Sequence, residues 1–246
     1  MYPNQPKGIG GVVGAGWHLY KACFFKILPL AFITAIVGSL TDFLEVTRVI
    51  AVPVAGSNQL VILFLSLVIT ILIMVWLMGT IYSLLSETAL GHSTRLLSSL
   101  QVASHHYWKL LIVFIITSII TIVGLILVVV PGIVLGVFLI FSLPLVIVDN
   151  RGIGGSIGHS LKLVAGSWWH VFMTLLIPII VIAVLSCVSF FIFGGTLSNL
   201  ASTPRWSNII SDIIIMTLLS PWLYGTIIML LNNVKLRKNL KASIIS

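Results

Sequence analysis

The chain has 246 residues, of which 59% are hydrophobic and only 7% are charged, and its mean hydropathy is +1.21. An average soluble domain is about 25% charged, so this composition excludes a water-soluble globule and predicts a membrane protein. The formal net charge is +8, but the basic residues are scattered at the ends of apolar stretches and form no single basic face. That distribution argues against a nucleic-acid-binding surface.

Six stretches are apolar enough to cross a hydrocarbon core, which is roughly 30 Å thick and needs about 20 helical residues. We expect these spans at residues 27–40, 60–85, 110–130, 132–148, 171–193 and 209–231. The first is short unless part of 22–25 belongs to it. Pro131-Gly132 separates the third span from the fourth, because proline lacks the backbone donor that a helix needs. These two spans are therefore expected to form a tight hairpin.

Arg151–His170 is expected to be a short amphipathic helix on the membrane surface, because its apolar residues recur at helical spacing. They are Ile153, Ile157, Leu161, Val164 and Trp168, and the residues expected off this stripe are His159, Ser160, Lys162 and Ser167. A similar stripe within Gly8–Phe25 consists of Ile9, Val13, Trp17, Tyr20 and Phe24. A weaker one lies in the connector Ser86–Tyr107, with Leu96, Leu100, Ala103 and Tyr107.

Each short segment precedes two spans, so the sequence predicts a threefold repeat within a single membrane domain, residues 1–246. The expected units are about 8–85, 86–148 and 149–232, followed by a basic tail at 233–246. Six spans place eleven Lys and Arg residues on the side of both termini and two, Arg48 and Arg205, on the other. The positive-inside rule then predicts cytoplasmic termini. The start, MYPNQPKGIGG, shows no removable signal peptide.

The stretch PLVIVDNRGIGGSIGHSLKLVAGSWWHVF, residues 144–172, has an acidic residue closing a span, then glycines, then Ser156, Ser160, Gly166 and an aromatic pair. It resembles the recurring segment of YciC-like bacterial inner-membrane proteins and is similar to the membrane domain of some glycerophosphoryl diester phosphodiesterases. The resemblance implies a polytopic inner-membrane protein with a role in envelope or lipid homeostasis. No soluble phosphodiesterase domain is present, so no catalytic residue carries over.

Aromatic and basic side chains flank the short segments, where such residues anchor helices to headgroups. The candidate lipid-interface residues are Trp17, Tyr20, Lys21, Tyr107, Trp108, Lys109, Lys162, Trp168 and Trp169. Asp212 is the candidate polar intramembrane residue, either stabilised by the dipole at the start of its helix or serving as a polar gate or proton site. No catalytic, cofactor-binding or metal-binding constellation is visible, since the six histidines lack ligand spacing.

These observations favour a non-enzymatic protein, without cofactors, whose expected partners are membrane lipids, anionic ones among them. A homo-oligomer and a membrane-protein partner stay open. The alternative is a small membrane transporter or channel, which six spans would allow but which the scarcity of charge at mid-membrane does not favour.

Overall fold

A computed structural model of the chain describes residues 2–3, 5–40, 58–92, 95–193 and 206–245, and these ranges are helical without a strand. The predicted polar loops with Arg48 and Arg205 lie outside the described residues. The helices are α1 Ile9–Ala22, α2 Phe24–Gly38, α4 Asn58–Leu90, α5 Leu96–His105, α6 Tyr107–Leu127, α7 Val129–Leu139, α8 Ser142–Val148, α9 Ile153–Val164, α10 Trp168–Ile192 and α11 Trp206–Ile245. The all-α prediction is confirmed.

Five described helical segments are long and apolar enough to cross a membrane: Phe64–Leu90, Tyr107–Leu127, Val129–Val148, Trp168–Ile192 and Trp206–Leu240. The predicted first span is shorter, because α2 has 15 residues and therefore extends only about 22 Å. Only α1 and α2 taken together are long and apolar enough to form a sixth candidate span, and the two helices are bent by 95° relative to each other. The chain is thus a multi-pass membrane protein with five to six candidate spans.

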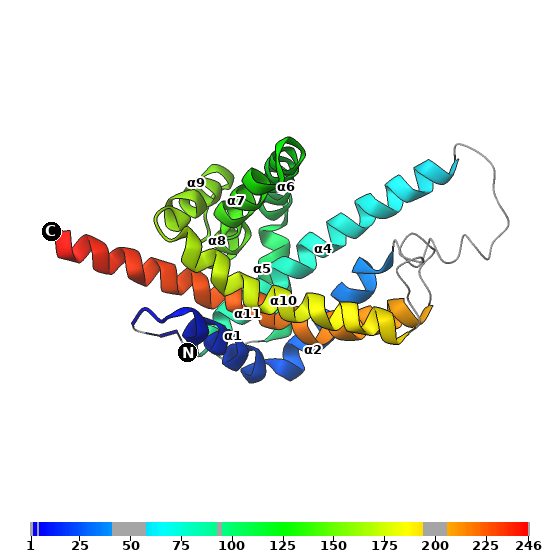
Figure 1. Cartoon of the computed structure of the whole chain (residues 1–246), viewed down its shortest axis with the longest axis horizontal. Helices are drawn as coiled ribbons and strands as arrows, with labels where there is room; N and C mark the ends of the chain where they lie inside the picture. The colour runs from blue at the N-terminus through cyan, green and yellow to red at the C-terminus, as the bar shows by residue number, and fades with distance from the viewer. Residues whose placement is uncertain (1, 4, 41–57, 93–94, 194–205, 246) are drawn as a thin grey trace.

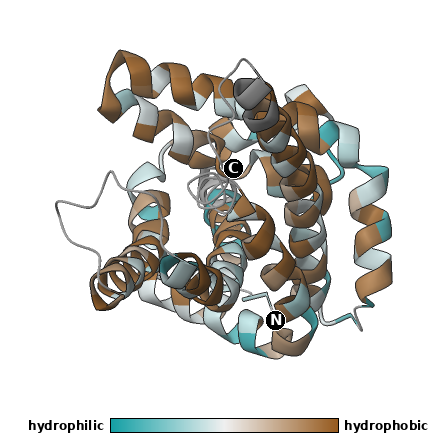
Figure 2. Ribbon diagram, turned by 90° about the vertical axis from the view of Figure 1, so that its right-hand side faces the viewer, coloured by the Kyte–Doolittle hydropathy of each residue, from teal (hydrophilic) through white to brown (hydrophobic). Residues whose placement is uncertain are grey.

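The long helices are apolar around most of their circumference, as the brown ribbons in Figure 2 show. Large apolar side chains are exposed along them, including Ile119 (56% exposed), Ile126 (79%) and Val184 (53%). In water this surface would be strongly unfavourable, at roughly 25 cal/mol per Å², whereas hydrocarbon accepts it. A helix that is apolar on all sides is typical of a membrane span.

The helices do not all run in one direction. Figure 1 shows α10 and α11 side by side along the long axis of the molecule, with α4 diverging from them. The α6–α7 hairpin is viewed nearly end-on there, so it crosses α10 and α11 steeply. Both termini lie at the same end of the view, which is the end where α9 packs.

The predicted hairpin exists, but its turn is misplaced in the prediction. The chain turns at Val128, whose extended backbone (φ −159°, ψ 138°) separates α6 from α7. Pro131 lies in the first turn of α7, where its missing N–H has no intrahelical partner to lose. Gly124 and Gly132 let the two helices touch, since a Cβ on Gly124 would lie 3.0 Å from the Gly132 Cα.

The core lies where the ends of α1, α4, α8, α9 and α11 meet. Its largest fully buried side chains include Leu19, Ile81, Leu85, Phe141 and Leu230. The basic tail expected at 233–246 is a helical continuation of α11 as far as Ile245. Lys235, Arg237 and Lys238 therefore project from a helix that begins inside the apolar region.

Candidate functional site: the interface formed by the short helices

The three short helices bury the same positions. Counted from the first helical residue, the fourth and eighth residues are buried in each helix: Val12 and Gly16 in α1, Ser99 and Ala103 in α5, Ser156 and Ser160 in α9. Apart from Val12 these side chains are small, which lets the helix axis approach its neighbour closely. At these two positions the short helices therefore approach the protein closely, and larger buried residues such as Leu19 in α1 and Leu163 in α9 complete the contact.

Helix α1 packs backbone against backbone on α11. A Cβ on Gly16 would lie 2.8 Å from both N and Cα of Thr226, and a Cβ on Gly225 would lie 3.0 Å from the Gly16 carbonyl oxygen. The Trp222 indole N–H donates to the Val13 carbonyl at 3.4 Å. Glycine on both sides is what permits this approach.

A second contact of this kind joins α5 to α4. The Trp76 indole N–H donates to Ser104 Oγ at 3.0 Å, and a Cβ on Gly79 would lie 3.5 Å from the Ala103 Cβ. In both long helices a threonine four residues after the tryptophan donates back to its carbonyl, Thr80 at 3.0 Å and Thr226 at 2.9 Å.

The two long helices share a sequence motif that the sequence reasoning above missed. Residues 76–85 read WLMGTIYSLL and residues 222–231 read WLYGTIIMLL, identical at seven of ten positions. A search for identical spaced letters would have found it. Its tryptophan and glycine are the residues that receive a short helix.

The third short helix, α9, is held by a serine. Ser160 is fully buried; its Oγ donates to the Phe138 carbonyl at 2.7 Å and accepts from the Phe141 N–H at 3.2 Å. These atoms flank the break between α7 and α8, where helical hydrogen bonds are missing. Ser160 thus satisfies the backbone at a break in the preceding helix.

This geometry corrects two expectations. Ser160, predicted to face headgroups and water, is inside the protein, whereas Leu161, predicted on the apolar stripe, is 39% exposed. Tyr20, a candidate lipid-interface residue, is only 3% exposed and belongs to the core. The reason is common to both: each helix has a protein-facing side in addition to a membrane-facing one, and spacing alone does not tell which is which.

The other aromatic candidates open the helices that follow. Helices α2, α6 and α10 each begin with two aromatic residues and a basic one: Phe24-Phe25-Lys26, Tyr107-Trp108-Lys109 and Trp168-Trp169-His170. The second aromatic residue is the exposed one in every case, at 86% for Phe25, 71% for Trp108 and 67% for Trp169.

The first aromatic residue of each triplet is half-buried. The Tyr107 hydroxyl donates to the Leu72 carbonyl at 3.3 Å, and Trp168 stacks on Phe172 with ring centroids 5.0 Å apart. Of the remaining candidates, Trp17 is 36% exposed with the Lys21 ammonium 5.4 Å from its ring centroid, and Lys109 and Lys162 are exposed.

A polar cluster holds both ends of the chain together. Asp149, at the end of α8, accepts from Lys235 Nζ at 2.6 Å and from Arg151 Nε at 3.4 Å. The Lys7 carbonyl accepts from Asn233 Nδ2 at 3.2 Å and from Arg237 Nη2 at 2.7 Å. The termini and the start of α9 therefore share one side of the molecule.

Close to this cluster, the His159 pKa is lowered from its ordinary value, first by burial and then by the positive charge of Arg151. The Arg151 Nη2 lies 3.5 Å from His159 Nε2. Burial and a neighbouring cation both disfavour the imidazolium form.

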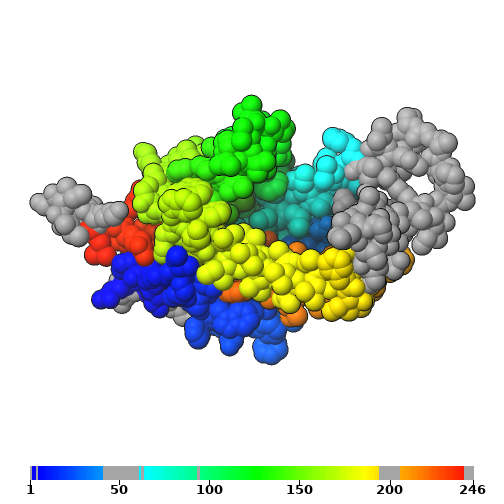
Figure 3. Space-filling view, in the orientation of Figure 1, coloured from blue at the N-terminus to red at the C-terminus, as the bar shows by residue number. Residues whose placement is uncertain are grey.

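A cavity of about 530 Å³, the elbow pocket, opens where α9 bends into α10. It is lined by Pro6, Gly166, Ser167, Trp168, Trp169, His170, Arg237 and Leu240. Gly166 makes the bend with φ of +81°, a conformation that other residues rarely adopt. The lining comes from the segment before α1, the bend after α9, the start of α10 and the end of α11. On the left side of Figure 3, the surfaces of α9 and the start of α10 lie against those of α1 and the end of α11.

A second cavity of about 450 Å³ lies among the spans and contains Asp212 in its lining. Its lining includes the hydroxyl-bearing residues Thr34, Ser39, Ser186 and Ser220, beside apolar ones. Thr34 and Ser39 donate their protons to the carbonyls of Leu30 and Ala35. Asp212, six residues after the start of α11, thus shares a mostly apolar lining with these hydroxyl groups.

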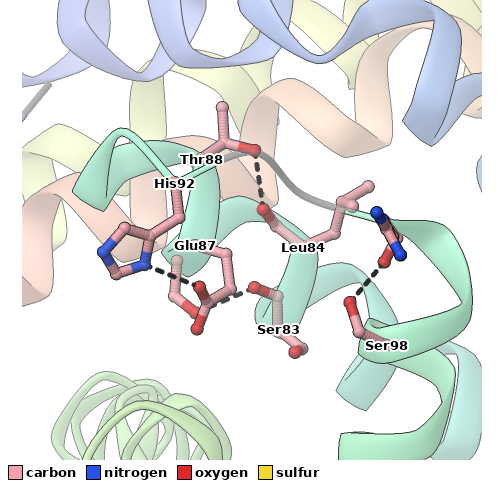
Figure 4. Close-up of polar contacts among 8 residues, drawn as sticks. Ser83, Leu84, Glu87, Thr88, His92 and Ser98 are labelled. Atoms are coloured by element: carbon pink, nitrogen blue, oxygen red, sulfur yellow. Dashed lines mark hydrogen bonds and ion pairs between the residues drawn. The ribbon is translucent and has the colours of Figure 1, made fainter.

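The middle connector makes local polar contacts at its start, and near its end the His106 Nε2 lies 2.8 Å from Asn150 Oδ1. Figure 4 shows His92 turned toward Glu87, with Nδ1 and Oε2 2.9 Å apart, and Thr88 turned back toward the Leu84 carbonyl. In the part of the chain that the structure describes, no three His, Cys, Asp or Glu side chains are grouped as metal ligands would be.

The long apolar helices define the class of the protein, a multi-pass α-helical membrane protein. No family model matches the chain, and no curated protein or solved structure matches it closely enough to indicate a relationship.

Proposed function

We propose that the chain is a bacterial inner-membrane protein that organises or handles anionic lipid at the cytoplasmic surface, without catalysis. The carrying observation is the aromatic pair followed by a basic residue at the start of α2, α6 and α10, with its second ring exposed each time. Rings of this kind partition to the headgroup level, and each nearby Lys or Arg adds about 1 kcal/mol of attraction to anionic lipid.

We further propose that the chain is a threefold repeat that closes on itself. The packing supports this: α5 contacts α4, α9 contacts α7 and α8, and α1 contacts α11, so each short helix contacts the second span of the preceding unit. The shared motif of α4 and α11 and the equivalent buried positions in the short helices are further support. The resemblance to YciC-like proteins at residues 144–172 agrees with this proposal.

The test is the lipid that the purified chain retains. The full chain is extracted in mild detergent, and native mass spectrometry measures the ratio of anionic to zwitterionic lipid bound. We expect anionic lipid to be enriched over its share in the membrane. Replacing the triplet lysines Lys26 and Lys109 together by glutamine should lower the enrichment, since the two charges together contribute up to about 2 kcal/mol.

The control is Arg95→Gln, an exposed cation at the start of α5 that no aromatic pair flanks. It should leave most of the enrichment in place. A native protein whose bound lipid matches the bulk membrane would refute the proposed function.

The alternative, a small transporter or channel, is favoured by one observation, the cavity that Asp212 lines together with hydroxyl groups. A solute path through the spans would need polar groups of this kind. Flux into proteoliposomes that disappears in Asp212→Asn would support transport, and an equal flux in both proteins would count against a role for this cavity.

A further inference from the structure

The elbow pocket has the chemistry of an anion site. Arg237 of α11 lines the pocket. Its Nε donates to Asn233 Oδ1 at 2.9 Å and its Nη2 donates to the Lys7 carbonyl, so the guanidinium is held in place. Its Nη1 makes no hydrogen bond to any described residue. The lining includes no carboxylate among the described residues. The nearest acidic group of the polar cluster, Asp149, is already paired with Lys235 and Arg151.

Helix α10 begins in the same pocket and adds to this preference. Its N-cap residue, Ser167, makes no side-chain hydrogen bond to the first turn, and the first backbone bond of the helix is from Val171 N–H to the Ser167 carbonyl at 3.1 Å. The N–H groups of residues 168–170 precede that bond. Such groups, together with the positive end of the helix dipole, favour an anion.

We propose that the elbow pocket binds the phosphate group of a single membrane phospholipid. Arg237 and the first N–H groups of α10 hold the phosphate oxygens, and the exposed Trp169 ring packs beside the lipid at headgroup level. This site rests on the proposed function and deepens it, because it adds one defined position for a lipid phosphate to the diffuse attraction between surface cations and anionic lipid. The volume lies within the usual range of ligand pockets, about 300–1,000 Å³.

The test uses the full chain in detergent, with native mass spectrometry to titrate phosphatidylglycerol, phosphatidylcholine and diacylglycerol. The first two carry a phosphodiester and the third does not. We expect the first two to bind at one saturable site and diacylglycerol to bind at least tenfold more weakly. Inorganic phosphate is added as a competitor, and we expect about 1 mM phosphate to leave the phospholipid bound.

Ser167→Asp is the informative variant. A carboxylate at this N-cap would bond the first-turn N–H groups itself, so the helix should keep its stability while the anion site is filled. We expect at least a tenfold loss of phosphatidylglycerol affinity with an unchanged or higher unfolding midpoint. The matched control is Gly152→Asp, which puts the same charge at the N-cap of α9, where a side chain meets no neighbour within 4 Å and which does not line the pocket.

Arg237→Gln and Arg237→Lys test the phosphate site a second time, through its cation and independently of the N-cap of α10. Glutamine should abolish saturable binding, and lysine should restore part of it, because the charge remains while the planar fork is lost. Equal losses in Ser167→Asp and Gly152→Asp would overturn the pocket and leave the proposed function standing. Absence of any phospholipid binding by the native chain would overturn both. Displacement by millimolar phosphate would overturn the lipid assignment in favour of free phosphate.

Discussion

Alanine at Gly16 would test the contact between the first and the last described helices. Its Cβ would lie 2.5 Å from Thr226 Oγ1 and 2.8 Å from the Thr226 N and Cα. Two of these three atoms belong to the backbone and cannot turn aside as a rotamer would, so α1 must move away from α11. Overpacking of this kind costs about 1–3 kcal/mol, against about 1 kcal/mol gained when alanine replaces glycine within a helix.

Gly14→Ala is the matched control on the same helix. Position 14 has no heavy atom within 4 Å of a Cβ, so it gains the helix propensity without the clash. The two variants should therefore differ by about 1–3 kcal/mol in the free energy of unfolding. On a chain of this size that is about 2–12 °C in the thermal midpoint, at about 2–4 °C per kcal/mol. Circular dichroism in detergent micelles measures it, and equal midpoints for Gly14→Ala and Gly16→Ala would refute the close-packing argument.

Three further predictions concern the polar groups. Ser160→Ala should lower the free energy of unfolding by about 1–3 kcal/mol, because it leaves the buried Phe141 N–H without an acceptor. Ser99→Ala removes a buried hydroxyl without a described partner and should be neutral or stabilising. Equal effects of the two variants in urea unfolding would contradict this. Asp149→Asn should weaken the fold more than Glu87→Gln, because Asp149 is 20% exposed and pairs with a lysine and an arginine, whereas Glu87 is 47% exposed and pairs with one histidine. Faster tryptic cleavage of the tail in Asp149→Asn is the expected readout. The stability of the fold should decrease as the pH drops below 6.5, because the pKa of His159 is lowered in the folded state and the unfolded state takes up the proton first. His159→Gln should lose part of this pH dependence. If the thermal midpoint of His159→Gln followed the native profile from about pH 8 to 5.5, a role of His159 would be excluded.

The class of the protein and its helices could be predicted from sequence because a membrane leaves the backbone few choices. Without water every N–H and C=O must be paired internally, so an apolar stretch of sufficient length is helical almost by necessity. This is why the spans around residues 64–90, 107–127 and 168–192 were predicted to within a few residues. The turn near Pro131 was misplaced because proline is acceptable both after a helix and in its first turn.

The packing faces could not be predicted from periodicity. A buried serine such as Ser160 cannot be told from an exposed one by residue type. Its burial depends on the Phe138 carbonyl, which lies 22 residues upstream at a break between helices. Leu161 and Tyr20 show the same limit for apolar residues, since lipid and protein interior both accept them. The tryptophan–glycine motif of α4 and α11 is present in the sequence as a repeated string of letters, but it is not periodic, so hydrophobic spacing does not reveal it.

Only some of the residues that line the elbow pocket could be predicted from the sequence. Trp168 and Trp169 were expected at the interface, but Arg237 was read as part of a basic tail. Its place beside them follows from the unbroken α11 helix, which carries the tail back across α9 and α10.

The contact of α1 with α11 has a consequence for synthesis. The glycine face of α1 emerges first, while the helix that covers it is completed only after nearly the whole chain has been made. Throughout that interval no protein covers the small-residue side of α1. A contact between such distant segments forms late and slowly. The unassembled chain therefore exposes a ready helix-docking face, and a second nascent copy presenting its own α11 could occupy it, exchanging first helices between two molecules.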